Sequence, residues 1–563
     1  MRSISSQTAV TQPRVQPKPA AYSQEPSIIL DPKMGSPFIA RDAIGTKSWP
    51  DHIFAACSVQ KFAASTGAGD LSQTHADAQG WVNYLSQFEP ANFYFKDASV
   101  STWEYLDPTD DWLNTYGVDS CIEFYHSGHG GMDGNGVFYA PLGSAWGNKD
   151  AWATSNDMFV GNQYLRYLFW STCFSVRVLD GQNPIRTWNN ANQGLRMILG
   201  YETTSVDAGN YGSAMWNQWN QGKSLSTAFM DASWYNVSTH QAPAVVAMGA
   251  TAQEAQDRVY NERFFSSQPA SKAWYWWRWY YAARSAFAQR AANITLPGRI
   301  TSARLTPSSA SPSHARAVFD RLPLELSFPR EVRANRDGAF HIAADDRRIG
   351  FDRHGAYDAQ FASPNLENRD LPALRELIAA AHGATRSHGL DREGIVFDRV
   401  FHKYDNGGST EGSGSIGTPR VSETVVQFVQ HIDGIPVVSP GQGRVTVTLD
   451  NDLQVTGVHD STRTVSRLVD QIPVRRARRE GLTPEIASAQ EPSELLASAW
   501  AQRLKTFIVN DSLPLGHAIV PGSFEVGYAI HEDTATLVAR EEVEVDFGHG
   551  LSKRYVVEVP ISA

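Results

Sequence analysis

Two short apolar runs, each ending in a reactive side chain, constrain the fold of this chain more than any other feature. The first run, Cys121–Tyr125, leads into His126-Ser127-Gly128-His129-Gly130-Gly131, and the second, Tyr167–Trp170, leads into Ser171-Thr172-Cys173. Runs rich in β-branched and aromatic residues that stop at glycines or small polar residues are typical of buried strands. In an open sheet of parallel strands, the loops beyond the carboxyl ends form the active site. We therefore expect a histidine and a cysteine to lie together at one edge of a sheet.

These two runs resemble the signature blocks of the caspase-like clan of cysteine peptidases, which includes metacaspases, clostripain, gingipains and legumains. In that clan one hydrophobic strand is followed by His-Gly, and a second is followed by a small residue and the nucleophilic cysteine. Phe124–Gly130 is similar to the metacaspase form of the first block, and Phe169–Cys173 fits the second. The sequence around the cysteine, Ser-Thr-Cys-Phe-Ser, differs from the caspase and metacaspase patterns, so the resemblance is to the clan and not to one of its families.

The resemblance implies a fold of the α/β class, with a caspase-like, mainly parallel sheet covered by helices on both faces. It makes His129 and Cys173 the catalytic dyad, and it makes the backbone amides of Gly130 and Cys173 the oxyanion hole. The residue types suit this chemistry, because a thiolate is a nucleophile and an imidazole titrates near neutral pH. His126 is the alternative imidazole, or an auxiliary one that hydrogen-bonds His129.

The remaining strands and helices follow from the flanking pattern. Alternating strands and helices indicate a mainly parallel sheet. The expected elements are strands at 53–58, 92–95 and 195–200, a helix at 74–88 and a long helix at 212–232.

The loop after the strand at 195–200 should reach the same edge as Cys173. In this loop Asp207 or Glu202 could bind a basic substrate side chain, although an aspartate just ahead of a helix is more often a helix cap. We expect Cys57 and Cys121 to be packing residues.

The uneven distribution of tryptophan along the sequence indicates two separate folding units. Fifteen of the 16 tryptophans precede residue 280, and Trp500 is the last. The Pro/Ser-rich stretch Pro307–Ser313 indicates the boundary between these two units. We expect a disordered leader at 1–45, a caspase-like catalytic domain at 46–292, a Pro/Ser-rich linker and irregular region at 293–364 and an α+β domain at 365–563.

The carboxyl-terminal region resembles the propeptides of thermolysin and fungalysin, which are often grouped with PepSY modules. The alternating segments Val425–Val437 and Arg444–Asp452 carry this resemblance, and a helix is expected before them at 371–381. A similar helix-then-strands unit follows from Glu494 to Val557. In metallopeptidases such modules chaperone and inhibit the enzyme, so the resemblance implies a domain that shields the edge bearing Cys173.

Charge and composition exclude other classes. The net charge of −10 argues against nucleic acid as a partner, because phosphate binding needs clustered positive charge. The basic run Arg475–Arg479 is either a solvated linker or a self-processing site. We find no zinc signature, phosphate-binding loop, signal peptide or membrane span, and three cysteines give no disulfide framework. The sequence thus predicts a cytoplasmic protein without a metal or cofactor, and it leaves the oligomeric state open.

Taken together, the sequence predicts a cysteine endopeptidase that hydrolyses peptide or protein substrates through a thioester and is regulated by its carboxyl-terminal domain. Two alternatives stay open at this point. One is a non-catalytic caspase-like binding protein, and the other is a hydrolase that acts on a non-peptide acyl bond.

Overall fold

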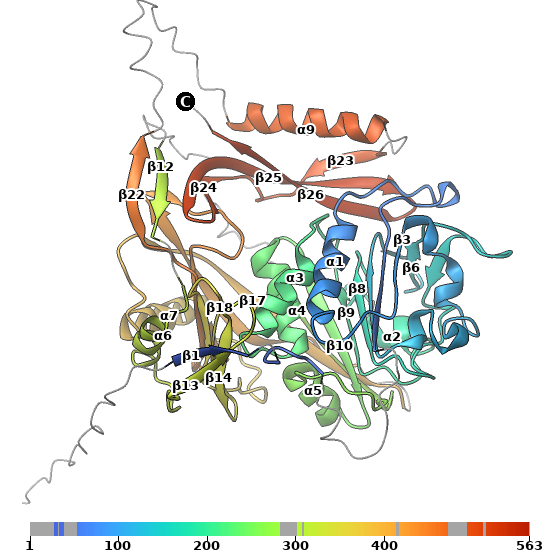
Figure 1. The fold of residues 1–563 in the computed structure, drawn as a ribbon, viewed down its shortest axis with the longest axis horizontal. Coiled ribbons are helices and arrows are strands. Elements are labelled where there is room, and N and C mark those ends of the chain that lie inside the picture. Colours follow the sequence, from blue (N-terminus) through green and yellow to red (C-terminus); the bar gives the residue numbers. More distant parts are fainter. Residues whose placement is uncertain are drawn as a thin grey trace, which may run out of the picture.

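The computed structural model describes residues 27–31, 33–38, 53–281, 301–306, 309–411, 416–470, 492–509 and 514–561. Its central feature is one sheet of 15 strands that runs through most of the molecule (Figure 1). A sheet of six strands lies across one end of it, and a three-stranded and a two-stranded sheet complete the structure. No helix in these residues is both long and apolar enough to cross a membrane.

The part of the large sheet that bears the two signature blocks is parallel. The five parallel strands, in spatial order, are β3 (Tyr94–Lys96), β2 (Phe54–Ser58), β4 (Glu123–Ser127), β8 (Tyr167–Ser171) and β9 (Met197–Tyr201). Nearly every residue in β2, β4, β8 and β9 is buried, as expected for strands covered on both faces. Strands β10 (Pro243–Gly249) and β11 (Trp274–Tyr281) follow in antiparallel order.

The expected fold class, a mainly parallel α/β sheet with a separate α+β domain, is wrong. Strand β11 pairs with β17 (Ile395–Ser409), so the sheet continues without a break into the carboxyl-terminal half, and all of this continuation is antiparallel. The whole structure is richer in strand than in helix, and its large sheets are mixed or antiparallel. The continuation consists of β18 (Arg420–Ile432) with β19 (Ile435–Pro436) beside it, β20 (Arg444–Leu449), β21 (Val455–Asp460), β16 (Tyr357–Gln360), β15 (Arg347–Phe351) and β14 (Phe340–Ala344).

Helices cover chiefly one face of the parallel strands, not both. On that face lie α1 (Thr74–Leu85), α3 (Tyr211–Trp219), α4 (Leu225–Asn236) and α5 (Ala252–Asn261). The other face packs mainly against the short helix α2 (Pro184–Trp188), single-turn 3₁₀ helices and the small sheet of β5 (Gly131–Met132), β6 (Phe138–Pro141) and β7 (Trp152–Thr154). The long helix expected at 212–232 is two helices, because Gly222 between them has a φ of 88°, which a helix does not allow.

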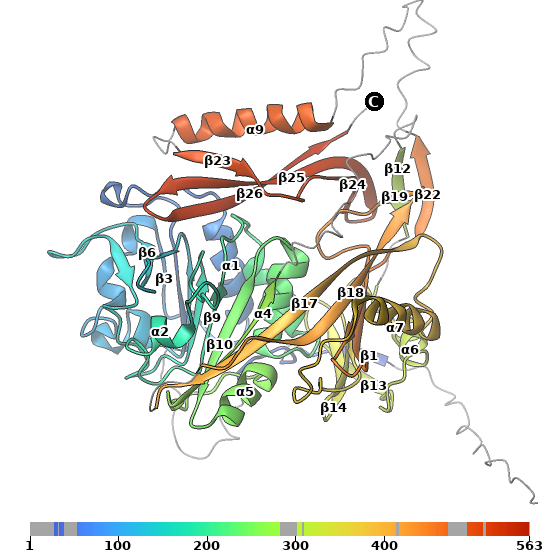
Figure 2. The same ribbon diagram turned by 180° about the vertical axis from the view of Figure 1, so that it is seen from behind.

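The six-stranded sheet lies across the carboxyl ends of the parallel strands (Figures 1 and 2). It is formed by β22 (Val465–Asp470), β12 (Thr301–Leu305), β25 (Thr534–Gly548), β23 (Gly516–Ile519), β24 (Glu525–His531) and β26 (Leu551–Pro560), with α9 (Pro492–Val509) packed on its outer side. Strands β25 and β26 form a long hairpin, and its turn contacts Gly67, in the loop after β2, and Tyr139 of β6.

Two expected boundaries also need correction. Residues 309–364, expected to be linker, contain α6 (Pro312–Phe319), β13 (Glu331–Ala334) and the strands β14, β15 and β16 of the large sheet. In the expected leader, β1 (Ser27–Leu30) pairs with β13, and Phe38 stacks on Phe54. The apolar residues of the expected leader pack into hydrophobic cores formed by residues later in the chain. One of these cores includes α7 (Leu374–Ser387). The basic run Arg475–Arg479 lies outside the described residues.

Candidate functional site

The carboxyl edge of the parallel strands brings the two signature loops together. Strands β4 and β8 are direct neighbours, with Ser127 opposite Ser171, and His129 and Cys173 each follow two residues later. Both side chains are fully buried. Gly130 lies against the second loop, since a Cβ atom at this position would be 2.5 Å from the carbonyl oxygen of Cys173. This close approach of the two backbones requires glycine.

The imidazole of His129 is neutral and held at one nitrogen. Its Nε2 lies 2.9 Å from the carbonyl oxygen of Gly69, so Nε2 is the protonated nitrogen and donates this bond. Its Nδ1 has no hydrogen-bond partner among the described residues, Cys173 included. Burial, together with the positive charge of Lys553, lowers the pKa of His129 from 6.5 to about 3. The rings of Phe62 and Phe547 pack against the imidazole of His129, with centroid distances of 5.0 and 5.2 Å.

The sulfur of Cys173 contacts two parts of the chain. The amide N–H of Ser205 donates to Sγ at 3.2 Å, and the Ser205 hydroxyl lies 3.5 Å away. The thiol itself donates to the backbone carbonyl of Ser552 in β26, with an Sγ–O distance of 3.1 Å. A peptide carbonyl from the carboxyl-terminal sheet therefore lies directly against the expected nucleophile.

Residues 552–554 of β26 pair with the loop that follows β9. The amide of Arg554 donates to the carbonyl of Ser205 at 3.1 Å, and the amide of Asp207 donates to the carbonyl of Arg554 at 2.8 Å. The hydroxyls of Ser552 and Thr204 are 2.9 Å apart. Together these contacts make a parallel β-bridge between Val206 and Arg554.

Lys553 enters the site and contacts the first signature loop and the loop that follows β9. Its side chain is 2% exposed, and its Nζ donates to the Ser205 hydroxyl at 2.9 Å and to the carbonyl of Gly128 at 3.3 Å. The ammonium group therefore lies beside the loop that carries His129 and beside the serine that contacts Cys173.

The two backbone amides expected to form an oxyanion hole belong to Gly130 and Cys173. Gly130 and Cys173 lie in the adjoining loops, and neither backbone N–H donates a hydrogen bond to another described residue.

His126, the residue expected to be an alternative or auxiliary imidazole, lies inside β4 and not in the loop. Its Nδ1 is 2.6 Å from the hydroxyl of Tyr105, and the indole of Trp170 packs on its ring at 4.9 Å. Burial, with a contribution from Lys553, lowers the pKa of His126 to about 3. No hydrogen bond joins His126 to His129 or to Cys173 among the described residues.

The two acidic residues expected to line a substrate pocket have structural partners instead. Glu202 accepts from the amide of Val178 and lies 3.4 Å from Arg177; burial, only partly offset by that arginine, raises the pKa of Glu202 to about 7. Asp207 accepts from the amide and hydroxyl of Ser72 at 3.0 and 2.7 Å, and from the amide of Gln73 at 3.1 Å. It thus binds the residues that precede α1, not the helix that follows it in sequence.

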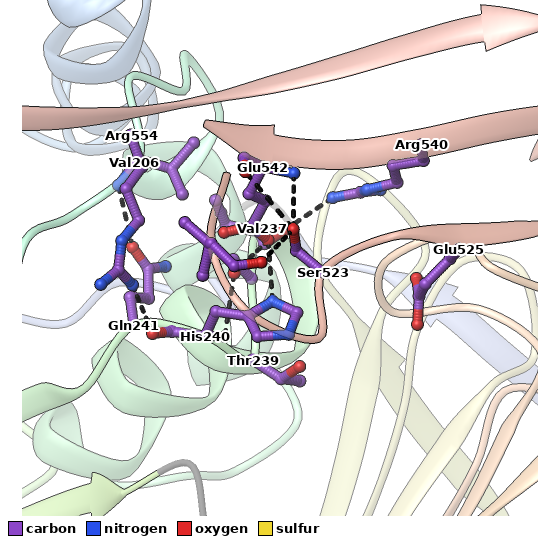
Figure 3. Close-up of polar contacts among 12 residues, drawn as sticks. Val206, Val237, Thr239, His240, Gln241, Ser523, Glu525, Arg540, Glu542 and Arg554 are labelled. Atoms are coloured by element: carbon purple, nitrogen blue, oxygen red, sulfur yellow. Dashed lines mark hydrogen bonds and ion pairs between the residues drawn. The ribbon is translucent and has the colours of Figure 1, made fainter. Parts of the chain in front are cut away.

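A second group of contacts fastens the β25–β26 hairpin beside the site (Figure 3). Glu542 of β25 accepts from the hydroxyl of Ser238 at 2.6 Å and lies 3.1 Å from Nδ1 of His240. Arg540 donates to the carbonyl of Val237 at 3.3 Å, and Arg554 donates to the carbonyl of His240. Burial disfavours the carboxylate of Glu542, but the bonds from His240 and Ser238 outweigh burial and lower its pKa.

The sequence did not reveal four residues that shape the site. Gly69, Ser205, Phe547 and Lys553 carry no motif. The turn Gly548-His549-Gly550 between alternating apolar residues was a signal for the β25–β26 hairpin. It gave no indication of where the hairpin docks, since that depends on contacts with residues some 350 to 480 positions away in sequence.

Comparison with known proteins adds one match. Residues 57–281 match a family model described as a domain of unknown function (DUF6345). This range contains both signature loops and Ser205, and it ends at the last residue of β11. No curated protein matches the chain.

Proposed function

We propose that this protein is a cysteine endopeptidase in which Cys173 is the nucleophile and His129 moves the proton. The observation that supports this most directly is the seating of residues 552–554. An extended backbone pairs with the loop at 204–207 and presents a peptide carbonyl 3.1 Å from Sγ. A substrate held in this way would bring its scissile carbonyl to the sulfur.

In the proposed reaction, Cys173 gives its proton to Nδ1 of His129, and Sγ attacks the carbonyl carbon of the substrate. The backbone N–H groups of Gly130 and Cys173 donate hydrogen bonds to the carbonyl oxygen as negative charge develops on it. The C–N bond breaks, the imidazolium returns its proton to the leaving amine, and a thioester remains. Water then attacks the thioester, giving a carboxylic acid and restoring the thiol.

The same contacts make the described form a latent one. Cys173 and His129 are fully buried, and a pKa of about 3 keeps the imidazole of His129 from taking up a second proton at neutral pH. Removing the hairpin would expose the imidazole and take away the charge of Lys553, and both changes raise its pKa. The carboxyl-terminal sheet would thus regulate the peptidase by covering it.

Hydrolysis of a denatured protein by the Lys553→Ala variant of the full chain tests this proposal. We expect new amino termini, each produced with the uptake of one water, and we expect none when Cys173→Ala or His129→Ala is added. Hydrolysis of thioesters or activated esters without any peptide cleavage would point to a non-peptide acyl substrate. Binding of peptides without cleavage of either kind of bond would point to a non-catalytic protein.

A further inference from the structure

We infer that the groove beside Cys173 selects substrates that carry a lysine side chain. In the described form, Lys553 of β26 occupies the binding site for that side chain, which is called the lysine seat below. This inference rests on the proposed function, since it names the substrate class of the same site. The lysine would lie at the residue next to the carbonyl that faces Sγ, as Lys553 lies next to Ser552.

The contacts of Lys553 define a small seat with two acceptors. The Ser205 hydroxyl and the Gly128 carbonyl bind Nζ at 2.9 and 3.3 Å. Both acceptors belong to residues 53–281, and both lie next to the proposed catalytic residues. Gly128 precedes His129 in the chain, and the Ser205 hydroxyl is 3.5 Å from the sulfur of Cys173. A side chain that reaches these acceptors is therefore fixed beside the reacting atoms.

The acceptors of the seat distinguish lysine from arginine. No carboxylate lies within 4 Å of Nζ among the described residues, and the nearby acids Glu202 and Asp207 bind other groups. An ammonium group is compact and has three donors that a hydroxyl and a carbonyl can meet. A guanidinium group presents five donors in a planar fork, which pairs best with a carboxylate. Lysine should therefore bind this seat better than arginine does.

The seat also distinguishes lysine from an apolar side chain of equal length. Norleucine would fill the same space but leave the acceptors of Gly128 and Ser205 buried without a donor. Main-chain pairing with 205–207, in contrast, involves only backbone atoms and would hold any extended peptide. Affinity would thus come partly from the backbone, and selectivity from the ammonium group.

Peptide binding to the full chain with the double substitution Lys553→Ala and Cys173→Ala tests the inference apart from catalysis. The probes are fluorescent peptides with an alanine and serine background and a single lysine, arginine or norleucine, and the measurement is fluorescence polarisation. We expect the lysine peptide to bind about tenfold more tightly than either of the others, the size expected for one charged hydrogen bond. The single variant Cys173→Ala, whose seat is filled by Lys553, should bind all three weakly.

Equal affinity for lysine and norleucine, or tighter binding of arginine, would overturn the inference. If Lys553→Ala alone does not let peptides enter the groove, Gly69→Ala in the Cys173→Ala background is a second variant in which the hairpin should leave the groove, because alanine at residue 69 would clash with Phe547. Absence of peptide binding in both variants would also overturn the inference. Hydrolysis by the Lys553→Ala chain is measured with the same peptides. Selective binding without hydrolysis would leave the lysine seat standing and refute the peptidase, whereas hydrolysis without selectivity would do the reverse.

Discussion

Gly69→Ala should open the site, because Gly69 gives the ring of Phe547 the space that it needs. A Cβ atom at residue 69 would lie 2.1 Å from Cδ1 and 2.3 Å from Cε1 of that ring, so the ring must retreat by more than 1 Å. Phe547 is 5% exposed and packs on His129, and it belongs to the hairpin that covers Cys173. Gly69 has no positive φ, so alanine does not strain the backbone there.

The size of the effect follows from overpacking, which costs about 1–3 kcal/mol in a well-packed interior. If this cost destabilises only the docked position of the β25–β26 hairpin, the population of the form in which the hairpin no longer covers Cys173 rises by a factor of about 5 to 150. The assay is the rate at which iodoacetamide labels Cys173 in the full chain, followed by intact mass and peptide mapping. Cys57 and Cys121 are buried with raised pKa values, and the Cys173→Ala chain gives their background.

Two controls make this prediction sharp. Gly134→Ala adds a methyl group where no atom lies within 4 Å, so it should leave the labelling rate unchanged. Phe547→Ala should speed labelling by itself, and Gly69→Ala should add little in that background, because the clash has been removed. A folded Gly69→Ala chain that labels at the wild-type rate, or full additivity of the two substitutions, would show that residue 69 does not act on the hairpin through the ring of Phe547.

Three further predictions concern stability and the interface. His126 and His129 have pKa values near 3 when folded, against 6.5 for an ordinary histidine, so the unfolded chain binds protons between these values and stability falls as the pH drops below 6.5. Each histidine should lower the free energy of unfolding by about 2 kcal/mol at pH 5, and urea titrations of wild type and His126→Phe should show a smaller loss in the variant. Glu542→Gln should speed labelling of Cys173 several-fold at pH 7, and because the folded pKa of Glu542 is lowered, this difference should shrink as the pH falls through and below its ordinary value of 4.5. Asp207→Asn should cost about 1–3 kcal/mol of stability in a thermal melt and leave lysine selectivity unchanged, whereas a change in selectivity would place Asp207 in the substrate pocket.

The parts of the fold that the sequence revealed are those fixed by local pattern. Continuous apolar runs identified β2, β4 and β8, because strands that are buried on both faces do not alternate between apolar and polar residues. The periodicity of residues 74–88 identified α1 for a similar reason. These elements also set the edge on which His129 and Cys173 lie.

The parts that it did not reveal depend on long-range pairing. Strand β11 places Tyr281 opposite His402, and nothing in the aromatic run Trp274–Tyr281 tells which strand will join its free edge. That single pairing turned two expected domains into one mixed sheet. Lys553 is a similar case, because a lysine in an alternating strand ordinarily faces solvent. Here the docked surface supplies its acceptors, so its burial could be recognised only from the assembled fold.

We propose that Cys173 and His129 form a peptidase site that the protein's own hairpin covers, and a covalent probe tests this proposal. The experiment is intact mass spectrometry of the full chain after incubation with a peptidyl acyloxymethyl ketone, comparing wild type, Lys553→Ala, and Lys553→Ala with His129→Ala. We expect slow modification of wild type, rapid modification of Lys553→Ala at Cys173 alone, and loss of that rapid reaction when His129 is removed. Failure of the probe to modify Cys173 in Lys553→Ala and Gly69→Ala alike, or equal rates with and without His129, would contradict a covered peptidase site formed by Cys173 and His129.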